Sequence, residues 1–122
     1  MNTIELLGEE ETFKNIVERG ITKFEDNKID VIRGYAFYGY STLTNVSFPV
    51  VTSIDGYALQ YCSSLTTIYV GTESDTICTL SNTNAFNNCT NLTNIYVPAS
   101  LVDSYKSATN WSNYASKIKA TP

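Results

Sequence analysis

The strongest constraint on the fold is a segment that the chain repeats. Residues 35–48 recur in altered form at 57–70 and again at 84–97. A leucine-threonine pair marks the same point in each copy, and an isoleucine-threonine pair stands in the same phase upstream. The four pairs begin at Ile21, Leu43, Leu65 and Leu92, at spacings of 22, 22 and 27 residues. Self-similarity at such a period is typical of solenoids, in which each repeat packs on its neighbours.

Apolar residues also recur at fixed spacings inside each copy. Two further apolar residues follow the leucine, three and five positions on, which is the L-x-x-L-x-L spacing of leucine-rich repeats. The end of this motif forms a short strand, and strands of successive coils pair in parallel about 4.8 Å apart. We therefore predict about four coils, the first incomplete, with core stacks along the solenoid. The stacks are Ala36, Ala58 and Ala85; Phe37, Leu59 and Phe86; Leu43, Leu65 and Leu92; Val46, Ile68 and Ile95.

The repeats resemble one particular class, the BspA-like leucine-rich repeats. Their pattern is Ala-Phe, a small loop, Cys, two residues, Leu-Thr and the strand, and residues 58–70 and 85–97 fit it best. Tyr40 replaces the cysteine in the first full coil, and Leu59 replaces the phenylalanine in the second. The resemblance covers roughly residues 21–98. It implies an α/β solenoid, a short right-handed coil with a parallel sheet of about four strands, one per coil, and helical caps at both ends.

The resemblance also implies a function. Proteins of this class are non-enzymatic modules for protein interaction or adhesion at a bacterial surface, so we expect a protein or glycan ligand. The segment from Tyr96 to Lys106, with Asn110-Trp111-Ser112 downstream, is similar to the terminal segment of short family members from gut bacteria and their prophages. That second likeness favours an alternative, a prophage-encoded virion component such as an accessory tail or host-recognition protein.

The segments flanking the repeats have the periodicity of helices. We predict a single domain, 1–122, with an N-terminal helical cap at 1–20, coils at 21–98 and a C-terminal helical cap at 99–122. An amphipathic helix is expected over 9–19, where Phe13, Ile16 and Val17 share a face and Gly20 follows the end. In the C-terminal cap, two helical stripes are expected. They comprise Leu101, Val102 and Tyr105, and then Trp111, Tyr114, Ala115 and Ile118.

The charge distribution disfavours several kinds of partner. The net charge is −4, and no lysine or arginine occurs from Gly34 to Tyr105. Binding to nucleic acid or to an anionic membrane surface requires such cations, so neither is expected. The first residues lack a cationic region followed by an apolar run, and no window approaches the length of a membrane span. We expect no membrane insertion, whereas the location, in the cytoplasm, at the cell surface or in a virion, stays open.

The residues for most catalytic chemistry are missing. The chain has no histidine, which removes the common nucleophile-base pairs and most zinc sites, and it has no phosphate-binding glycine motif. We therefore expect no enzyme activity, no cofactor and no metal. Cys62 and Cys89 occupy one repeat position in adjacent coils, so either a disulfide or two buried thiols would fit. Cys78 falls in an insertion of five residues between coils, which is either a bulged turn with Ile77 or Leu80 reaching the core or a binding loop.

The outer face of the predicted sheet is the best candidate for a ligand site. Residues between the inward positions form two rows, Lys23, Asn45, Thr67, Asn94 and Glu25, Ser47, Tyr69, Tyr96. Two adjacent tyrosines either stabilise the sheet as a cross-strand pair or form a recognition surface. We take Tyr69 and Tyr96 as the candidate centre, with Asn45, Ser47, Thr67 and Asn94 beside them. Tyr38 is expected on the opposite side of the coil, and binding without basic residues should depend weakly on salt.

Overall fold

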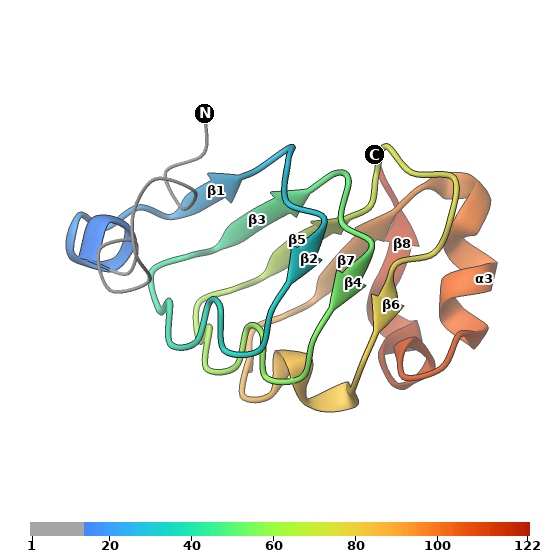
Figure 1. Ribbon diagram of the computed structural model, residues 1–122. Helices are drawn as coiled ribbons and strands as arrows, with labels where there is room; N and C mark the ends of the chain where they lie inside the picture. Colours follow the sequence, from blue (N-terminus) through green and yellow to red (C-terminus); the bar gives the residue numbers. More distant parts are fainter. Residues whose placement is uncertain (1–13) are drawn as a thin grey trace.

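Two parallel sheets face each other across the core of the computed structural model, which describes residues 14–122. The larger sheet has the strand order β1-β3-β5-β7-β8, and the smaller has the order β2-β4-β6. Figure 1 shows the smaller sheet in front of the larger one, with the connecting turns along the lower edge. The chain therefore winds from one sheet to the other and back once per coil. The predicted short leucine-rich repeat solenoid is confirmed.

The strands of the larger sheet are short and lie in the predicted register. The first four come from the coils: β1 (Lys23–Glu25), β3 (Asn45–Phe48), β5 (Thr67–Val70) and β7 (Asn94–Val97). Within this series Asn45 pairs with Thr67 and Thr67 with Asn94, while Val46 pairs with Ile68 and Ile68 with Ile95. The alternation places one row in the core and the next on the outer face, as the repeat spacing predicts.

The smaller sheet explains the insertion between the second and third full coils. Its strands are β2 (Val31–Ile32), β4 (Ser53–Ile54) and β6 (Thr79–Leu80). Ile32 pairs with Ile54 and Ile54 with Leu80, and all three side chains are buried. The extra residues are thus absorbed in the turn before β6, and Leu80 returns to the core position. The bulged-turn interpretation is correct for this part of the insertion.

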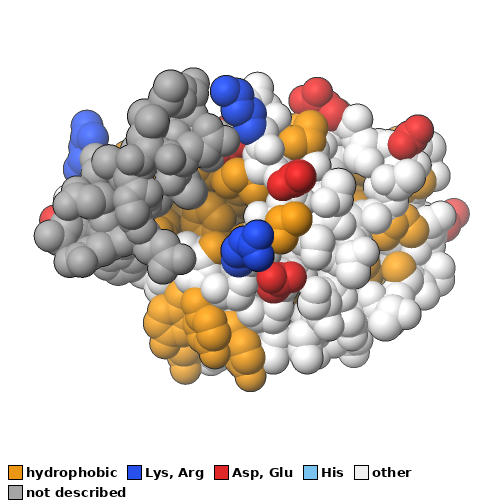
Figure 2. All heavy atoms as spheres, in the orientation of Figure 1, with side chains coloured by type: hydrophobic (Ala, Val, Ile, Leu, Met, Phe, Trp, Pro, Cys, Tyr) orange, Lys and Arg blue, Asp and Glu red, His pale blue; other side chains and the backbone are white. Residues whose placement is uncertain are grey.

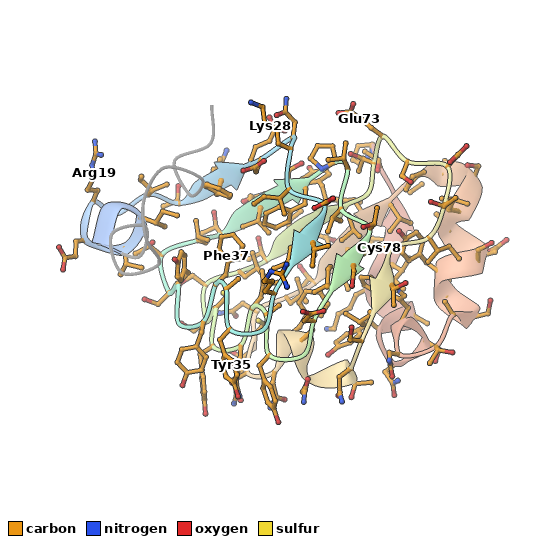
Figure 3. All side chains as sticks on the ribbon, in the orientation of Figure 1. Arg19, Lys28, Tyr35, Phe37, Glu73 and Cys78 are labelled. Atoms are coloured by element: carbon orange, nitrogen blue, oxygen red, sulfur yellow. The ribbon has the colours of Figure 1, made fainter. Side chains whose placement is uncertain are left out.

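The predicted core stacks fill the space between the two sheets. Each of the apolar residues placed in them is buried, apart from Ala36, which is partly buried. Phe37 shows how they pack, because its ring lies 5.5 Å from that of Phe48 and 5.2 Å from that of Tyr40, centroid to centroid. Figure 3 shows Phe37 projecting between the layers. Tyr40, which stands where later coils have cysteine, is also buried.

The threonine of the repeated Leu-Thr pair links neighbouring coils. The hydroxyl of Thr44 donates to the carbonyl of Thr22 at 3.1 Å, that of Thr66 to Thr44 at 3.1 Å, and that of Thr93 to Thr66 at 3.3 Å. Backbone amides of the later coil reach the same carbonyls. A threonine at this point therefore adds a side-chain bond to each strand start, which explains why the pair recurs.

The N-terminal end of the coil begins with a helical turn, η1 (Lys14–Glu18). Ile16 is buried and Val17 packs against the core, as predicted, whereas Phe13 and the start of the expected helix lie outside the described residues. The turn ends at Gly20, whose φ is +65°. The Gly20 amide donates to the carbonyl of Val17, and the Ile21 amide to that of Ile16, which is a Schellman motif. The boundary of the cap at residue 20 stays a prediction.

The C-terminal end differs from the prediction in its last element. After η2 (Thr83–Phe86) and β7, the chain forms η3 (Ala99–Leu101), α3 (Val102–Ser107) and η4 (Trp111–Lys117). The second helical stripe does not continue through Ile118, because the residues from there form β8 (Ile118–Ala120), a fifth strand that pairs with β7. Ile118 takes the position of Ile95 in the core and satisfies the otherwise open edge of β7, which outweighs helical periodicity.

Candidate functional site

The outer face of the larger sheet brings the six candidate residues together. We call them the strand-face site: Asn45, Ser47, Thr67, Tyr69, Asn94 and Tyr96. Tyr69 pairs with Ser47 on one side and with Tyr96 on the other. The two tyrosine rings lie 5.1 Å apart, centroid to centroid, with 34° between their planes. Both are half-buried, so they present a continuous but shallow aromatic surface.

The polar candidates are already engaged in hydrogen bonds. The side-chain amide of Asn94 donates to the hydroxyl of Thr67 at 3.3 Å, and the Thr67 side chain is buried. The Thr44 hydroxyl donates to the side-chain oxygen of Asn45 at 3.0 Å. These bonds hold the amides in fixed positions beside the tyrosines. Thr67 therefore acts mainly as a support, and Asn45, Asn94 and Ser47 supply the accessible polar groups.

Lys119 is a member of this surface that sequence reasoning missed. It lies in β8, in register with Tyr96, and its ammonium group donates to the side-chain oxygen of Asn94 and to the carbonyl of Thr93. The apolar spacing of residues 111–118 predicts a helix, so it does not indicate that the next residue lies on the sheet. The site thus has charge at both ends, with Lys23 and Glu25 on β1 and Lys119 on β8. The expectation that binding depends only weakly on salt loses its premise.

A shallow depression adjoins the tyrosine pair. Its volume is about 360 Å³, and it runs from β1 over β3 to Tyr69 on β5. Such a hollow gives a partner chain a place to insert a side chain beside the rings. The residues that line it are Lys23, Phe24, Glu25, Asn45, Val46, Ser47 and Tyr69.

A second aromatic group stands on the turns that connect the two sheets. We call Tyr35, Tyr38, Tyr57 and Tyr61 the turn-edge cluster. Tyr35 is 57% exposed, Tyr38 44% and Tyr61 46%, whereas the strand-face tyrosines are half-buried. The sequence predicts only that Tyr38 lies on the opposite side of the coil from the strand face. Exposed positions leave no apolar periodicity, and the one available signal was the recurrence of tyrosine at equivalent points of two coils.

Three of these tyrosines have an unusual backbone conformation. Tyr35, Tyr57 and Tyr61 have φ of 63°, 62° and 62°. This left-handed region costs about 1 to 2 kcal/mol for a residue with a Cβ atom, and bulky residues rarely adopt it. At the position of Tyr61 the other full coils have Gly39 and Asn88, which also have positive φ and suit it better. The turn requires the conformation, but it does not require tyrosine.

The cysteines of the repeats are free, buried thiols. The Cys62 thiol donates to the carbonyl of Phe37 at 3.1 Å, and the Cys89 thiol to that of Leu59 at 3.0 Å, so each binds the same point of the preceding coil. A hydrogen bond with Cys89 and burial raise the pKa of the Cys62 thiol, which keeps it protonated at neutral pH. Of the two arrangements that fitted the sequence, the structure has the thiols.

Cys78 and the C-terminal aromatic residues form a buried polar contact. The Cys78 amide donates to the hydroxyl of Tyr105 at 2.8 Å, and the indole nitrogen of Trp111 donates to the Cys78 carbonyl at 2.7 Å. Burial raises the pKa of both Cys78 and Tyr105 to about 12. Figure 3 places Cys78 between β6 and the α3 end of the molecule. The contact fastens the C-terminal segment to the coils, so we assign it a structural role.

The remaining surface of the insertion forms an open hollow of about 650 Å³ lined in part by Glu73 and Asp75. Because part of the insertion lines this hollow, a binding loop at residues 71–81 stays a prediction. Among residues 14–122 there is no group of three histidine, cysteine or acidic side chains that could hold a metal ion. Over the same residues, no helix has the length and apolar character needed to cross a membrane.

Comparison with known proteins gives one finding. A family profile described as BspA type leucine rich repeat region matches residues 9–119, in six copies. The matched span contains every strand described above except the last residue of β8. No curated protein and no solved structure matches the chain.

Proposed function

The chain belongs to the BspA-type leucine-rich repeat family, and we propose that it is a non-enzymatic module that binds an extended protein segment on its strand-face site. The observation that carries the proposal is the Tyr69–Tyr96 ring pair beside a depression of about 360 Å³. Tyrosine is common among interface hot spots, because a rigid ring and a hydroxyl combine large contact area with a polar handle.

The charges around the site support a peptide rather than a neutral ligand. Lys23, Glu25 and Lys119 flank the tyrosines, so a partner with charged side chains gains complementary contacts at either end. Rim charges mainly accelerate association and make it sensitive to salt. Binding should therefore weaken with ionic strength, and the change Lys119→Ala should reduce that dependence.

At a finer level, we propose adhesion at a bacterial surface as the role of this binding. The C-terminal segment, similar to that of short family members from prophages, supports the alternative of a virion component. The two roles predict different locations. Antibody labelling of intact cells and of purified phage particles from the same culture distinguishes them, because each role places the protein in only one fraction.

The binding proposal can be tested with selected peptides. Random linear peptides displayed on phage are selected against the immobilised protein alone, and the affinity of each selected peptide is then measured for the wild type and for Tyr69→Ala/Tyr96→Ala. We expect peptides whose affinity for the double variant falls by 2 kcal/mol or more, about 30-fold. Tyr38→Ala, on the turns, is the matched control and should bind these peptides normally. Recovery of peptides that bind the folded double variant equally well would refute the strand-face site, and the hollow at residues 71–81 would become the leading candidate.

A further inference from the structure

The turn-edge cluster is the most prominent aromatic surface of the described residues. Figure 3 shows Tyr35 at the lower edge of the molecule, pointing away from both sheets. Figure 2 shows hydrophobic side chains projecting at that same edge, outside the body of the coil. A ring exposed to water gains little from burial, so neither the hydrophobic core nor the sheets require the exposed Tyr35, Tyr38 and Tyr61 here.

The four rings form one continuous array across two coils. Tyr35 and Tyr57 are stacked, with centroids 5.2 Å apart and 8° between the planes. Tyr38 lies 5.7 Å from Tyr35 and meets Tyr61 edge-on at 5.5 Å. The backbone fixes the spacing, because the Gly39 amide donates to the Gln60 carbonyl at 2.9 Å. The array is therefore ordered before any ligand arrives, which lowers the entropic cost of binding.

The backbone conformation gives independent support for a function. Tyr35, Tyr57 and Tyr61 have positive φ, a region in which glycine and asparagine are favoured. In the other coils Gly39 and Asn88 occupy the position of Tyr61, so the turn forms without a tyrosine. Strained residues that the fold does not need tend to occur at ligand sites, and the inference runs from the observed strain to function.

The composition of the turns indicates the kind of ligand. The turns at 34–42, 56–64 and 83–91 contain no charged residue, and the nearest charges along the chain, Arg33 and Asp55, precede them. Beyond the rings, the turns present the side-chain amides of Gln60, Asn87 and Asn88, the last two exposed. A surface that combines rings with neutral amides suits a ligand with apolar faces and many hydroxyl groups but no charge. Peptides and nucleic acids fit less well, because their charges would lose water without gaining an ionic partner.

We propose that the turn-edge cluster binds a neutral glycan chain. The C–H faces of its pyranose rings pack on the accessible faces of Tyr35, Tyr38 and Tyr61, and its hydroxyl groups bond to the tyrosine hydroxyls and to the amides of the next coil. Binding involves no covalent step. The site lies on the turns and is separate from the strand-face site, so the two can be tested independently.

The experiment uses affinity gel electrophoresis of the full chain in gels that contain one polysaccharide each. The neutral probes are dextran, mannan, xylan and hydroxyethyl cellulose, and the charged probes are heparin and polygalacturonate. We expect retardation by at least one neutral polysaccharide, with little change on adding salt, since no charge takes part. Tyr38→Ala/Tyr61→Ala should weaken that binding about tenfold or more, whereas Tyr69→Ala/Tyr96→Ala, on the other surface, should leave it unchanged.

A second variant separates binding from folding. Tyr61→Asn keeps the turn, because asparagine accepts positive φ as Asn88 does in the next coil, yet it removes a ring. It should melt no lower than Tyr61→Ala and should also lose affinity for the neutral polysaccharide. The proposal is overturned if no neutral polysaccharide retards the protein, if only the charged ones do, or if the folded cluster variants bind as the wild type does. Tyrosine-dependent binding of a protein ligand alone would overturn it as well, in favour of a protein interface.

Discussion

The strand face and the turn edge both carry clustered tyrosines, but they are built in opposite ways. On the strand face, Tyr69 and Tyr96 occupy regular extended backbone, half-buried and held beside Asn94 and Thr67. On the turn edge, three of four tyrosines have positive φ, and three of four, all except the half-buried Tyr57, are exposed to water. Sheet register alone explains the first group. It does not explain the second, which costs conformational energy without adding to the core. Regular extended backbone therefore holds tyrosines at no conformational cost, whereas positive φ at tyrosine on the turn edge requires an explanation beyond the fold.

Removal of a core ring should have the largest effect and tests whether the turns are as rigid as the sheet. Phe86 lies in η2 beneath the turns, 5.4 Å from Tyr114 and 6.1 Å from Trp111 between ring centroids. Phe86→Ala should lower the free energy of unfolding by about 3 to 5 kcal/mol, and Ile68→Ala, in β5, by about 2 to 5 kcal/mol. Denaturant unfolding measures both. A Phe86→Ala loss below about 1 kcal/mol would mean that the turn edge is loosely packed and the comparison is invalid.

A rise to alkaline pH should have the next largest effect on stability, and it tests the buried contact between Cys78 and Tyr105, which lies apart from both tyrosine surfaces. The pKa of Cys78 rises from 9.0 to about 12 and that of Tyr105 from 10.0 to about 12, because burial favours their neutral forms. Their contribution to stability is complete below pH 9 and is lost as the pH rises toward 12. Each group should remove about 1.4 kcal/mol per pH unit within its window.

Chemical unfolding between about pH 8 and about pH 11 measures this slope. Cys78→Ala is the matched control. It should abolish the loss of stability that begins near pH 9, where the thiol of the unfolded chain ionises, and keep the loss that begins near pH 10, which is due to Tyr105. A stability that stays constant over this range would show that neither group is desolvated in solution, and that the C-terminal segment opens more readily than the contact with Trp111 suggests.

The smallest expected effect is the difference in stability between asparagine and alanine at position 61, and it tests directly whether the turn-edge backbone is strained. At position 61, asparagine tolerates positive φ and alanine does not, so Tyr61→Asn should be more stable than Tyr61→Ala by about 1 kcal/mol. At position 69, in an extended strand, the same pair should show no advantage for asparagine, which is depleted in strands. Thermal unfolding of the four variants decides the matter. Equal gains at both positions would show that the turn-edge backbone is not strained.

The strand face could be predicted from the sequence and the turn edge could not, because only the first follows the apolar period of the repeats. Leu43, Leu65 and Leu92 mark the period, and a period of this kind fixes strand register, so the core and the six strand-face residues were predictable. Lys119 was not, because a three-residue strand after Trp111 and Tyr114 is too short to interrupt a helical pattern. The turn-edge cluster was missed for a different reason, since exposure leaves no apolar signal and positive φ at a tyrosine contradicts its local preference.

The hydroxyl and thiol bonds between coils give the solenoid a direction. Thr44, Thr66 and Thr93 each donate to the carbonyl of the threonine one coil earlier, and Cys62 and Cys89 also donate backward. The threonine of each full coil thus donates its hydroxyl to the preceding coil, and the carbonyls at this position accept from the following coil, so successive coils join through the same pair of groups. A duplicated 22-residue unit placed before residue 57 would find matching partners on both sides. Each such duplication would lengthen both sheets by about 4.8 Å and add a copy of Tyr35 and Tyr38 to the turn edge, so the reach of that surface can evolve without a change in how the ends of the solenoid are closed.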